Sequence, residues 1–142
     1  MKRFYLIGFL VRARRPELVP LVHALTFDPV LRATEVLSPL GSTMQEQSLR
    51  EESWQWTKAH YDELLTVVPK HHAQTSLIYA GGVFCDDAHV QDVEAFFTRA
   101  RVAQIEGGPR VLASTLESMR LCVVRRAKQE ASARELFAAN RR

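Results

Sequence analysis

Residues 87–126 read DAHVQDVEAFFTRARVAQIEGGPRVLASTLESMRLCVVRR, and in both halves of this stretch apolar residues recur three and four positions apart. The first half carries Val90, Val93, Phe96, Phe97 and Ala100, and the second half carries Leu112, Leu116, Met119 and Val123. Because residues three and four apart share one face of a helix, each half predicts an amphipathic helix that needs a neighbour to cover it. The segment Gly107-Gly108-Pro109 predicts a break between them, with the proline in the first turn of the second helix.

The same spacing continues through the rest of the chain, and no alternating run is bounded by hairpin turn signals. It predicts seven or eight helices, at about residues 2–12, 16–26, 29–39, 46–68, 71–84, 87–102, 109–126 and 128–139. The short connections between them force consecutive helices into antiparallel pairs. We therefore expect an all-α fold of stacked antiparallel hairpins, arranged as a HEAT-like or armadillo-like superhelical solenoid.

Several predicted helix ends have local causes in the sequence. Pro16 is expected in the first turn of the second helix, and Asp28-Pro29 is expected to open the third helix with a carboxylate cap and a proline. Gly41-Ser42-Thr43 is expected to end that third helix. Asp86 or Asp87 is expected to cap the helix at 87–102, and Gly81-Gly82 is expected to allow close packing of helices.

Size and composition indicate one folded domain over residues 1–142. Apolar residues make up 46% and charged residues 25% of the chain, as in ordinary globular proteins. The net charge of +3 is too small to favour a nucleic-acid partner. No run approaches the roughly 18 apolar residues of a membrane span, so we expect no membrane partner. The apolar stretch at residues 4–11 predicts a buried helix and not a signal peptide, since no small-residue cleavage site follows it.

The two cysteines, Cys85 and Cys122, lie 37 positions apart, and neither belongs to a Cys-x-x-Cys pair. This spacing indicates neither a disulfide framework nor a structural zinc site. We expect two buried free thiols in a reducing compartment, and hence a cytoplasmic protein.

Residues that could carry catalysis or bind metal are sparse. Five histidines are present, but there is no H-E-x-x-H, and His60 with Glu63 predicts only a surface pair. His71-His72 are expected to be solvated. There is no G-x-S-x-G elbow and no phosphate-binding glycine loop. The acidic residues near 86–94 are expected to cap helices and to be solvated. We therefore predict no catalytic residue, no metal site and no cofactor in this chain.

The order of motifs resembles the end of a zinc aminopeptidase of the aminopeptidase N and endoplasmic-reticulum aminopeptidase family. The segments that carry the resemblance are Pro16-Glu17-Leu18-Val19, Asp28-Pro29 with Leu31-Arg32, Trp54-Gln55-Trp56, Tyr61-Asp62-Glu63-Leu64, Val93-Glu94-Ala95-Phe96-Phe97, Gly107-Gly108-Pro109-Arg110-Val111-Leu112 and Leu116-Glu117-Ser118-Met119-Arg120. Two positions depart from the family, Cys122 where relatives often have Asn and Arg125 where they often have Trp. The resemblance covers nearly the whole chain.

The resemblance implies a non-catalytic C-terminal domain that encloses the active-site chamber and helps to admit and orient peptide substrates. The zinc and its ligands would then lie in the catalytic domain of the same parent chain, and that domain and the peptide would be the partners. It also suggests that Arg110 and Arg120 contact the peptide carboxylate or the neighbouring domain. An equally open interpretation is that these arginines pair with Glu117 or with carbonyl groups at helix ends.

Two other classes of function stay open at this point. A free-standing helical-repeat scaffold would bind a protein or peptide on a concave face. A nucleic-acid-binding function would rest only on the basic C-terminal region around 120–142. A domain separated from its enzyme is further expected to expose apolar surface and to self-associate.

Overall fold

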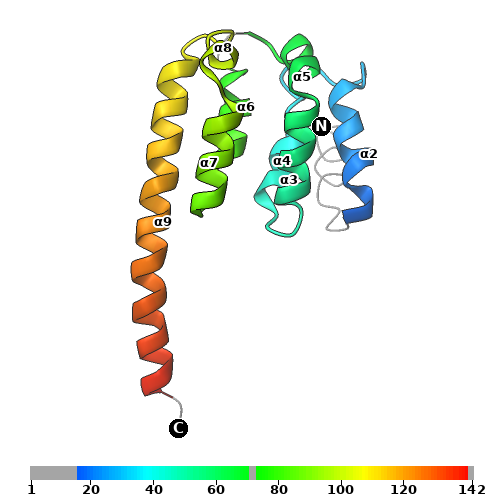
Figure 1. The fold of residues 1–142 in the computed structure, drawn as a ribbon. Coiled ribbons are helices and arrows are strands. Elements are labelled where there is room, and N and C mark those ends of the chain that lie inside the picture. The colour runs from blue at the N-terminus through cyan, green and yellow to red at the C-terminus, as the bar shows by residue number, and fades with distance from the viewer. Residues whose placement is uncertain (1–15, 71–72, 141–142) are drawn as a thin grey trace.

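The computed structural model describes residues 16–70 and 73–140, and all regular structure within these ranges is helical (Figure 1). The elements are η1 (Pro16–Leu18), α2 (Val19–Ala24), η2 (Leu25–Phe27), α3 (Ser38–Gln45), α4 (Arg50–Ala59), α5 (Tyr61–Val67), α6 (Thr75–Gly81), α7 (Asp87–Phe96), α8 (Arg99–Val102) and α9 (Gly108–Ala139). The predicted all-α class is confirmed. The predicted helix at 2–12 lies outside the described residues.

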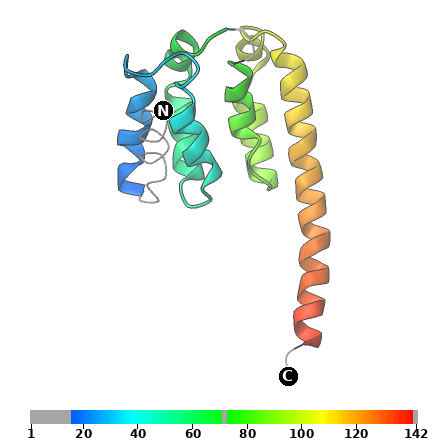
Figure 2. The same cartoon turned by 180° about the vertical axis from the view of Figure 1, so that it is seen from behind.

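The helices form two groups that lie side by side. Figures 1 and 2 show α2 to α5 in one group and α6 to α9 in the other. Within the first group α3 packs on α2 and α4, and within the second α9 packs on α6, α7 and α8. Helix α4 contacts α6 across the boundary between the groups. The stacking of hairpins into a solenoid stays a prediction.

One hydrophobic core joins the two groups. Trp54 of α4 is fully buried at its centre, with its ring centroid 5.6 Å from that of Phe96 and 6.2 Å from that of Phe97. Tyr61 of α5 meets the ring of Phe96 edge-on at 5.3 Å. The core therefore depends on aromatic side chains that α4 and α5 extend toward α7.

The two predicted apolar stripes are largely confirmed. The buried members are Val90, Val93, Phe97, Leu116 and Met119, and those packed partly buried against the core are Phe96, Leu112 and Val123. Ala100 is exposed and lies outside the core. The apolar stripes of α7 and α9 face each other, so each helix provides the neighbour that the other was predicted to need.

The predicted helix at 29–39 is wrong. Asp28 does not open a helix, because its carboxylate accepts a hydrogen bond from the backbone N–H of Val30 at 2.7 Å and closes a turn instead. Turns continue as far as Leu37, and α3 begins at Ser38 with Pro39 in its first turn. The segment at 41–43 lies inside α3 and does not end it.

Three other predicted boundaries also differ. The predicted helix at 46–68 is interrupted at His60, which ends α4 and precedes α5. The predicted helix at 87–102 breaks after α7, and Thr98 caps the short α8 by accepting from Arg101 N at 3.3 Å. The predicted helices at 109–126 and 128–139 are one helix, α9, because neither Gly nor Pro occurs between Arg110 and Ala139.

The glycine pair at the end of α6 allows close packing, as predicted. A Cβ atom at Gly81 would lie 2.8 Å from Val93 Cγ2 and 3.1 Å from Trp54 Cη2. A Cβ atom at Gly82 would lie 2.6 Å from Thr115 Cγ2 on α9. Only glycine, which has no Cβ, fits at these two positions while the helices keep their separation.

Among the described helices, none is both long and apolar enough to span a bilayer.

Candidate functional site

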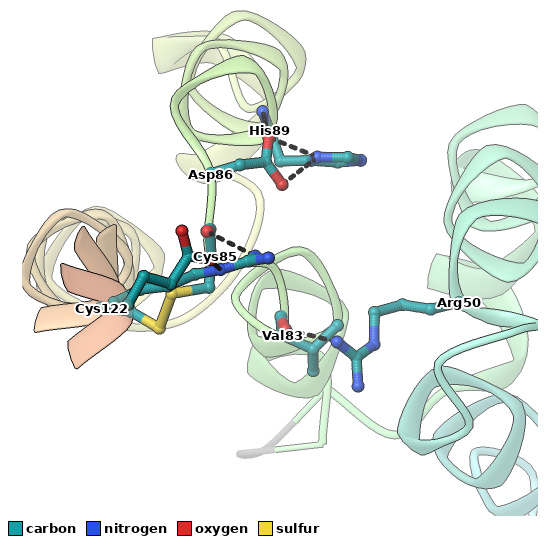
Figure 3. Close-up of a disulfide and its surroundings, with 8 residues drawn as sticks. Arg50, Val83, Cys85, Asp86, His89 and Cys122 are labelled. Carbon is teal, nitrogen blue, oxygen red and sulfur yellow. Dashed lines mark hydrogen bonds and ion pairs between the residues drawn. A yellow bond between two sulfur atoms is a disulfide. The ribbon is translucent and has the colours of Figure 1, made fainter. Parts of the chain in front are cut away.

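The loop between α6 and α7, residues 82–86, is tied to both helical groups (Figure 3). Arg50 of α4 donates from Nη1 to the carbonyl oxygen of Val83 at 3.1 Å and from Nε to that of Met44 at 2.9 Å. Its guanidinium carbon lies 6.0 Å from the ring centroid of Phe84. One arginine therefore links α3, α4 and this loop.

Cys85 in this loop and Cys122 on α9 form a disulfide, with Cα atoms 5.4 Å apart. The prediction of two free thiols is wrong, because helix packing brings together two positions that are 37 residues apart in sequence. Arg126, one turn further along α9, donates to the carbonyl oxygen of Cys85 at 3.5 Å. The loop is thus attached to α9 by a covalent bond and by a hydrogen bond.

His89 connects the loop to α4. Asp86 caps α7, as predicted, by accepting from His89 N at 3.0 Å, and both of its carboxylate oxygens lie 2.8 Å from His89 Nδ1. His89 Nε2 lies 2.7 Å from Glu51 Oε2, and the imidazole stacks on the Phe84 ring at 3.7 Å. Both ring nitrogens are occupied, so this imidazole serves as a link between two carboxylates and not as a general base.

The two carboxylates set the charge state of His89. Partial burial alone would lower the pKa of the imidazole, but hydrogen bonds to Glu51 and Asp86 outweigh burial and hold that pKa above its usual value. The same contacts act in the opposite direction on the pKa of the Glu51 carboxyl, which Gln55 and His89 lower together.

A second ionic contact joins α4 to α7 at Asp92. Its carboxylate accepts from Trp54 Nε1 at 2.6 Å and from Lys58 Nζ at 2.7 and 2.9 Å. Burial opposes the ionised form, but these donors hold the pKa of Asp92 below its usual value. Four residues of α4 therefore contact residues 83–92, namely Arg50, Glu51, Trp54 and Lys58.

The other ring contacts gather around Trp56 in the first helical group. Buried His23 has its ring centroid 4.6 Å from that of Trp56, and its Nε2 lies 2.8 Å from Thr43 Oγ1. Burial, with a smaller contribution from His60, lowers the pKa of His23 to about 4. The predicted surface pair is confirmed, because His60 Nδ1 lies 3.1 Å from Glu63 Oε2.

The residues considered for metal binding form no cluster in the part of the chain that the structure describes, where no three His, Cys, Asp or Glu side chains are placed to hold an ion. His71-His72 lie outside the described residues. Of the acidic residues near 86–94, Asp86 caps α7, Asp92 binds Lys58, and Glu94 accepts from Arg120.

The structure does not bring Arg110 and Arg120 together. Both lie on α9, ten residues or roughly 15 Å apart along the axis. Arg110 is exposed in the first turn, and Arg120 donates from Nη2 to Glu94 Oε2 at 2.9 Å with both side chains more than half exposed. Arg120 therefore pairs with Glu94 of α7 and not with Glu117, and a contact of either arginine with a peptide carboxylate or a neighbouring domain stays a prediction.

Apolar side chains are exposed on both helical groups. Those at least half exposed are Leu21, Val30, Tyr79, Leu121, Val124, Leu136 and Phe137. Tyr79 also borders a groove of about 140 Å³ between α3 and α6, which Leu37, Leu40 and Met44 line from the other side. Apolar residues are thus exposed on several elements, while a patch that faces a parent chain and self-association stay predictions.

A comparison with known families supplies the remaining finding. The family model of the ERAP1-like C-terminal domain matches residues 3–121, which include all the described helices up to the packed part of α9. No curated protein and no solved structure matches the chain.

Proposed function

This chain belongs to the ERAP1-like C-terminal domain family, and on that premise we propose that it is the non-catalytic helical domain of a zinc-dependent aminopeptidase. The observation that carries the proposal is the family match over residues 3–121, which spans both helical groups and their common core. The zinc and the residues that cleave the peptide bond would belong to the catalytic domain of the same parent chain.

Within such an enzyme, the domain would enclose the active-site chamber and help to admit and orient peptides for removal of their N-terminal residues. Its helices would form one segment of a HEAT-like or armadillo-like solenoid. The exposed residue Arg110 and the solvent-facing pair of Arg120 with Glu94 support a contact with an anionic group. Exposed apolar residues such as Tyr79 and Leu121 support a contact with the catalytic domain.

The expected cytoplasmic location has lost its supporting argument. It rested on free thiols in a reducing compartment, whereas Cys85 and Cys122 are paired.

The first test is the intact mass of the native product in its source cells, detected with an antibody against residues 16–70. If the detected species has several times the mass of a 142-residue chain, the result supports a domain of a larger aminopeptidase. A product of about this length would instead favour the free-standing scaffold that binds a protein or peptide.

The second test concerns activity. The heavy species, immunopurified, should release the N-terminal residue of an aminoacyl-arylamide and lose this activity when a chelator removes zinc. The purified 142-residue chain should not hydrolyse the same substrate. Hydrolysis by this chain alone would overturn the assignment of a non-catalytic domain.

A further inference from the structure

Helix α9 has a packed half and a free half. As far as Val123 one face of the helix lies against the core, and Leu116 and Met119 are buried there. From Val124 to Ala139 every side chain that the structure describes is exposed. Figures 1 and 2 show this second half continuing well past the ends of α6 and α7. The Cys85–Cys122 disulfide stands at the point where the packed half ends.

We propose that the Cys85–Cys122 disulfide is a redox latch, which a dithiol reductant opens to release the end of the packed half of α9 from the α6–α7 loop. Neither cysteine belongs to the hydrophobic core. Opening the bridge therefore removes a link at the edge of the fold and leaves the contacts around Trp54 and Leu116 in place.

A reductant can reach the bridge from solvent. Cys122 is exposed, and Cys85 lines a surface hollow of about 360 Å³ together with Asp86, Arg126 and Glu130. Figure 3 shows the bridge between α9 and the loop that leads to Asp86 and His89. Thiol–disulfide exchange requires access to one sulfur along the S–S axis. Cys122 is the more exposed of the two residues, and we take its sulfur as the point of attack.

The greater exposure of Cys122 favours one direction of opening. A reductant thiolate attacks Cys122 Sγ, the S–S bond breaks, and Cys85 Sγ leaves as a thiolate that takes a proton from water. The guanidinium of Arg126 hydrogen-bonds to the Cys85 carbonyl at 3.5 Å and also pairs with Glu130 at 3.1 Å. The second thiolate of the reductant then attacks the reductant sulfur that is bonded to Cys122 in the mixed disulfide. Cys122 leaves as a thiolate, and the oxidised reductant is a disulfide.

Opening the latch changes how two segments are held. The end of the packed half of α9 keeps buried Met119, the partly buried Val123, the exposed Arg120–Glu94 pair and the long Arg126 hydrogen bond. The loop at 82–86 loses its covalent attachment to α9 but keeps Arg50 and the α7 cap. Local opening of both segments should therefore become easier, while α4 and α5 are unaffected.

The test is hydrogen exchange of the whole chain, followed by mass spectrometry, before and after treatment with dithiothreitol. We expect exchange to become faster, on the order of tenfold, in peptides covering 117–127 and 82–89, with no change at 50–67. The double variant Cys85→Ser, Cys122→Ser serves as the matched control. It should exchange as the reduced chain does and should not respond to dithiothreitol.

Three results would overturn the proposal. The first is alkylation of both cysteines in the denatured chain without prior reduction, since the bridge would then be absent. The second is unchanged exchange at 117–127 after reduction. The third is loss of helical circular dichroism on reduction, because the bridge would then support the whole fold and not a local attachment.

Discussion

His23 and His89 respond to acid in opposite ways because their partners differ. His23 is fully buried against Trp56, and protonation would place a positive charge in the core. His89 lies between the carboxylates of Glu51 and Asp86, which favour its protonated form. One sequence therefore contains a histidine that destabilises the fold on acidification and another that stabilises it.

We predict that His23 makes the chain less stable as the pH falls below neutrality. Its folded-state pKa of about 4 lies below the ordinary 6.5, so the unfolded state binds more protons between these values. The His23 contribution is therefore complete above pH 6.5 and is lost on acidification, by at most about 3 kcal/mol at pH 4. Urea denaturation at several pH values should show a shallower acid loss in His23→Gln.

His89 provides the internal comparison for this experiment. Its raised pKa adds stability that is complete below pH 6.5 and is lost as the pH rises through its folded-state value. A His89→Gln variant should therefore lose stability more steeply than the wild type when the pH falls from 8 to 6. Equal pH slopes in the wild type and His23→Gln would contradict the assignment for His23.

Arg110 and Arg120 can be separated by kinetics in the full parent enzyme. If either binds the C-terminal carboxylate of a peptide, its replacement by Ala should raise KM for short peptides about tenfold and leave kcat nearly unchanged. Hydrolysis of an aminoacyl-arylamide, which has no such carboxylate, should not change. Arg134→Ala on the free half of α9 is the control. An equal change with both substrates would rule out recognition of the carboxylate.

Among the elements, the contact of α6 with α4 and α7 depends on Gly81. We predict that Gly81→Ala destabilises the chain by about 1–3 kcal/mol, because the added Cβ would lie 2.8 Å from Val93 Cγ2 and must displace it. Gly41 in α3 is the matched control, since a Cβ there meets nothing within 4 Å. Gly41→Ala should stabilise the chain by about 0.5–1 kcal/mol. Thermal unfolding of both variants would decide this, and equal effects would contradict it.

An element could be predicted where its own residues carry an unambiguous sequence pattern. The stripes on α7 and α9 were predictable, because burial requires apolar residues at helical spacing and both helices are packed on one face. The turn at 28–37 was not, because Asp-Pro can begin a helix or an Asx-turn, and Asp28 forms the turn. The break at His60 was also missed, since neither Gly nor Pro marks it.

The candidate site was harder to predict than the helices. A local rule predicted that Asp86 or Asp87 would cap a helix, and Asp86 does so. The disulfide and the ties from Arg50, Glu51 and Lys58 to residues 83–92 join positions more than 30 apart, and only tertiary packing brings them together. The pairing of the two cysteines had no local signal in their spacing.

For the molecule as a whole, the disulfide closes a large loop. We predict that Cys85→Ser with Cys122→Ser lowers the free energy of unfolding by about 2–4 kcal/mol, because an open loop spanning 37 positions gives the unfolded chain more conformational freedom. Urea denaturation without reductant is the measurement. With dithiothreitol present, the wild type should match the double variant, and a persistent difference would mean that the serines perturb the fold by themselves.

The free half of α9 should add almost nothing to the stability of the rest. Packing on the core ends at Val123, close to residue 121 where the family match ends, and the described side chains beyond it are exposed. A chain ending at Ala127 should therefore unfold within about 0.5 kcal/mol of the full chain, since exposed positions outside a packed interface rarely matter more. A chain ending at Ser118 is the control, because it also loses buried Met119 and the disulfide and should be destabilised by more than about 3 kcal/mol. A large loss in the first chain would show that residues beyond 127 pack on the body, whereas the expected result would leave the free half of α9 available for contacts outside this domain.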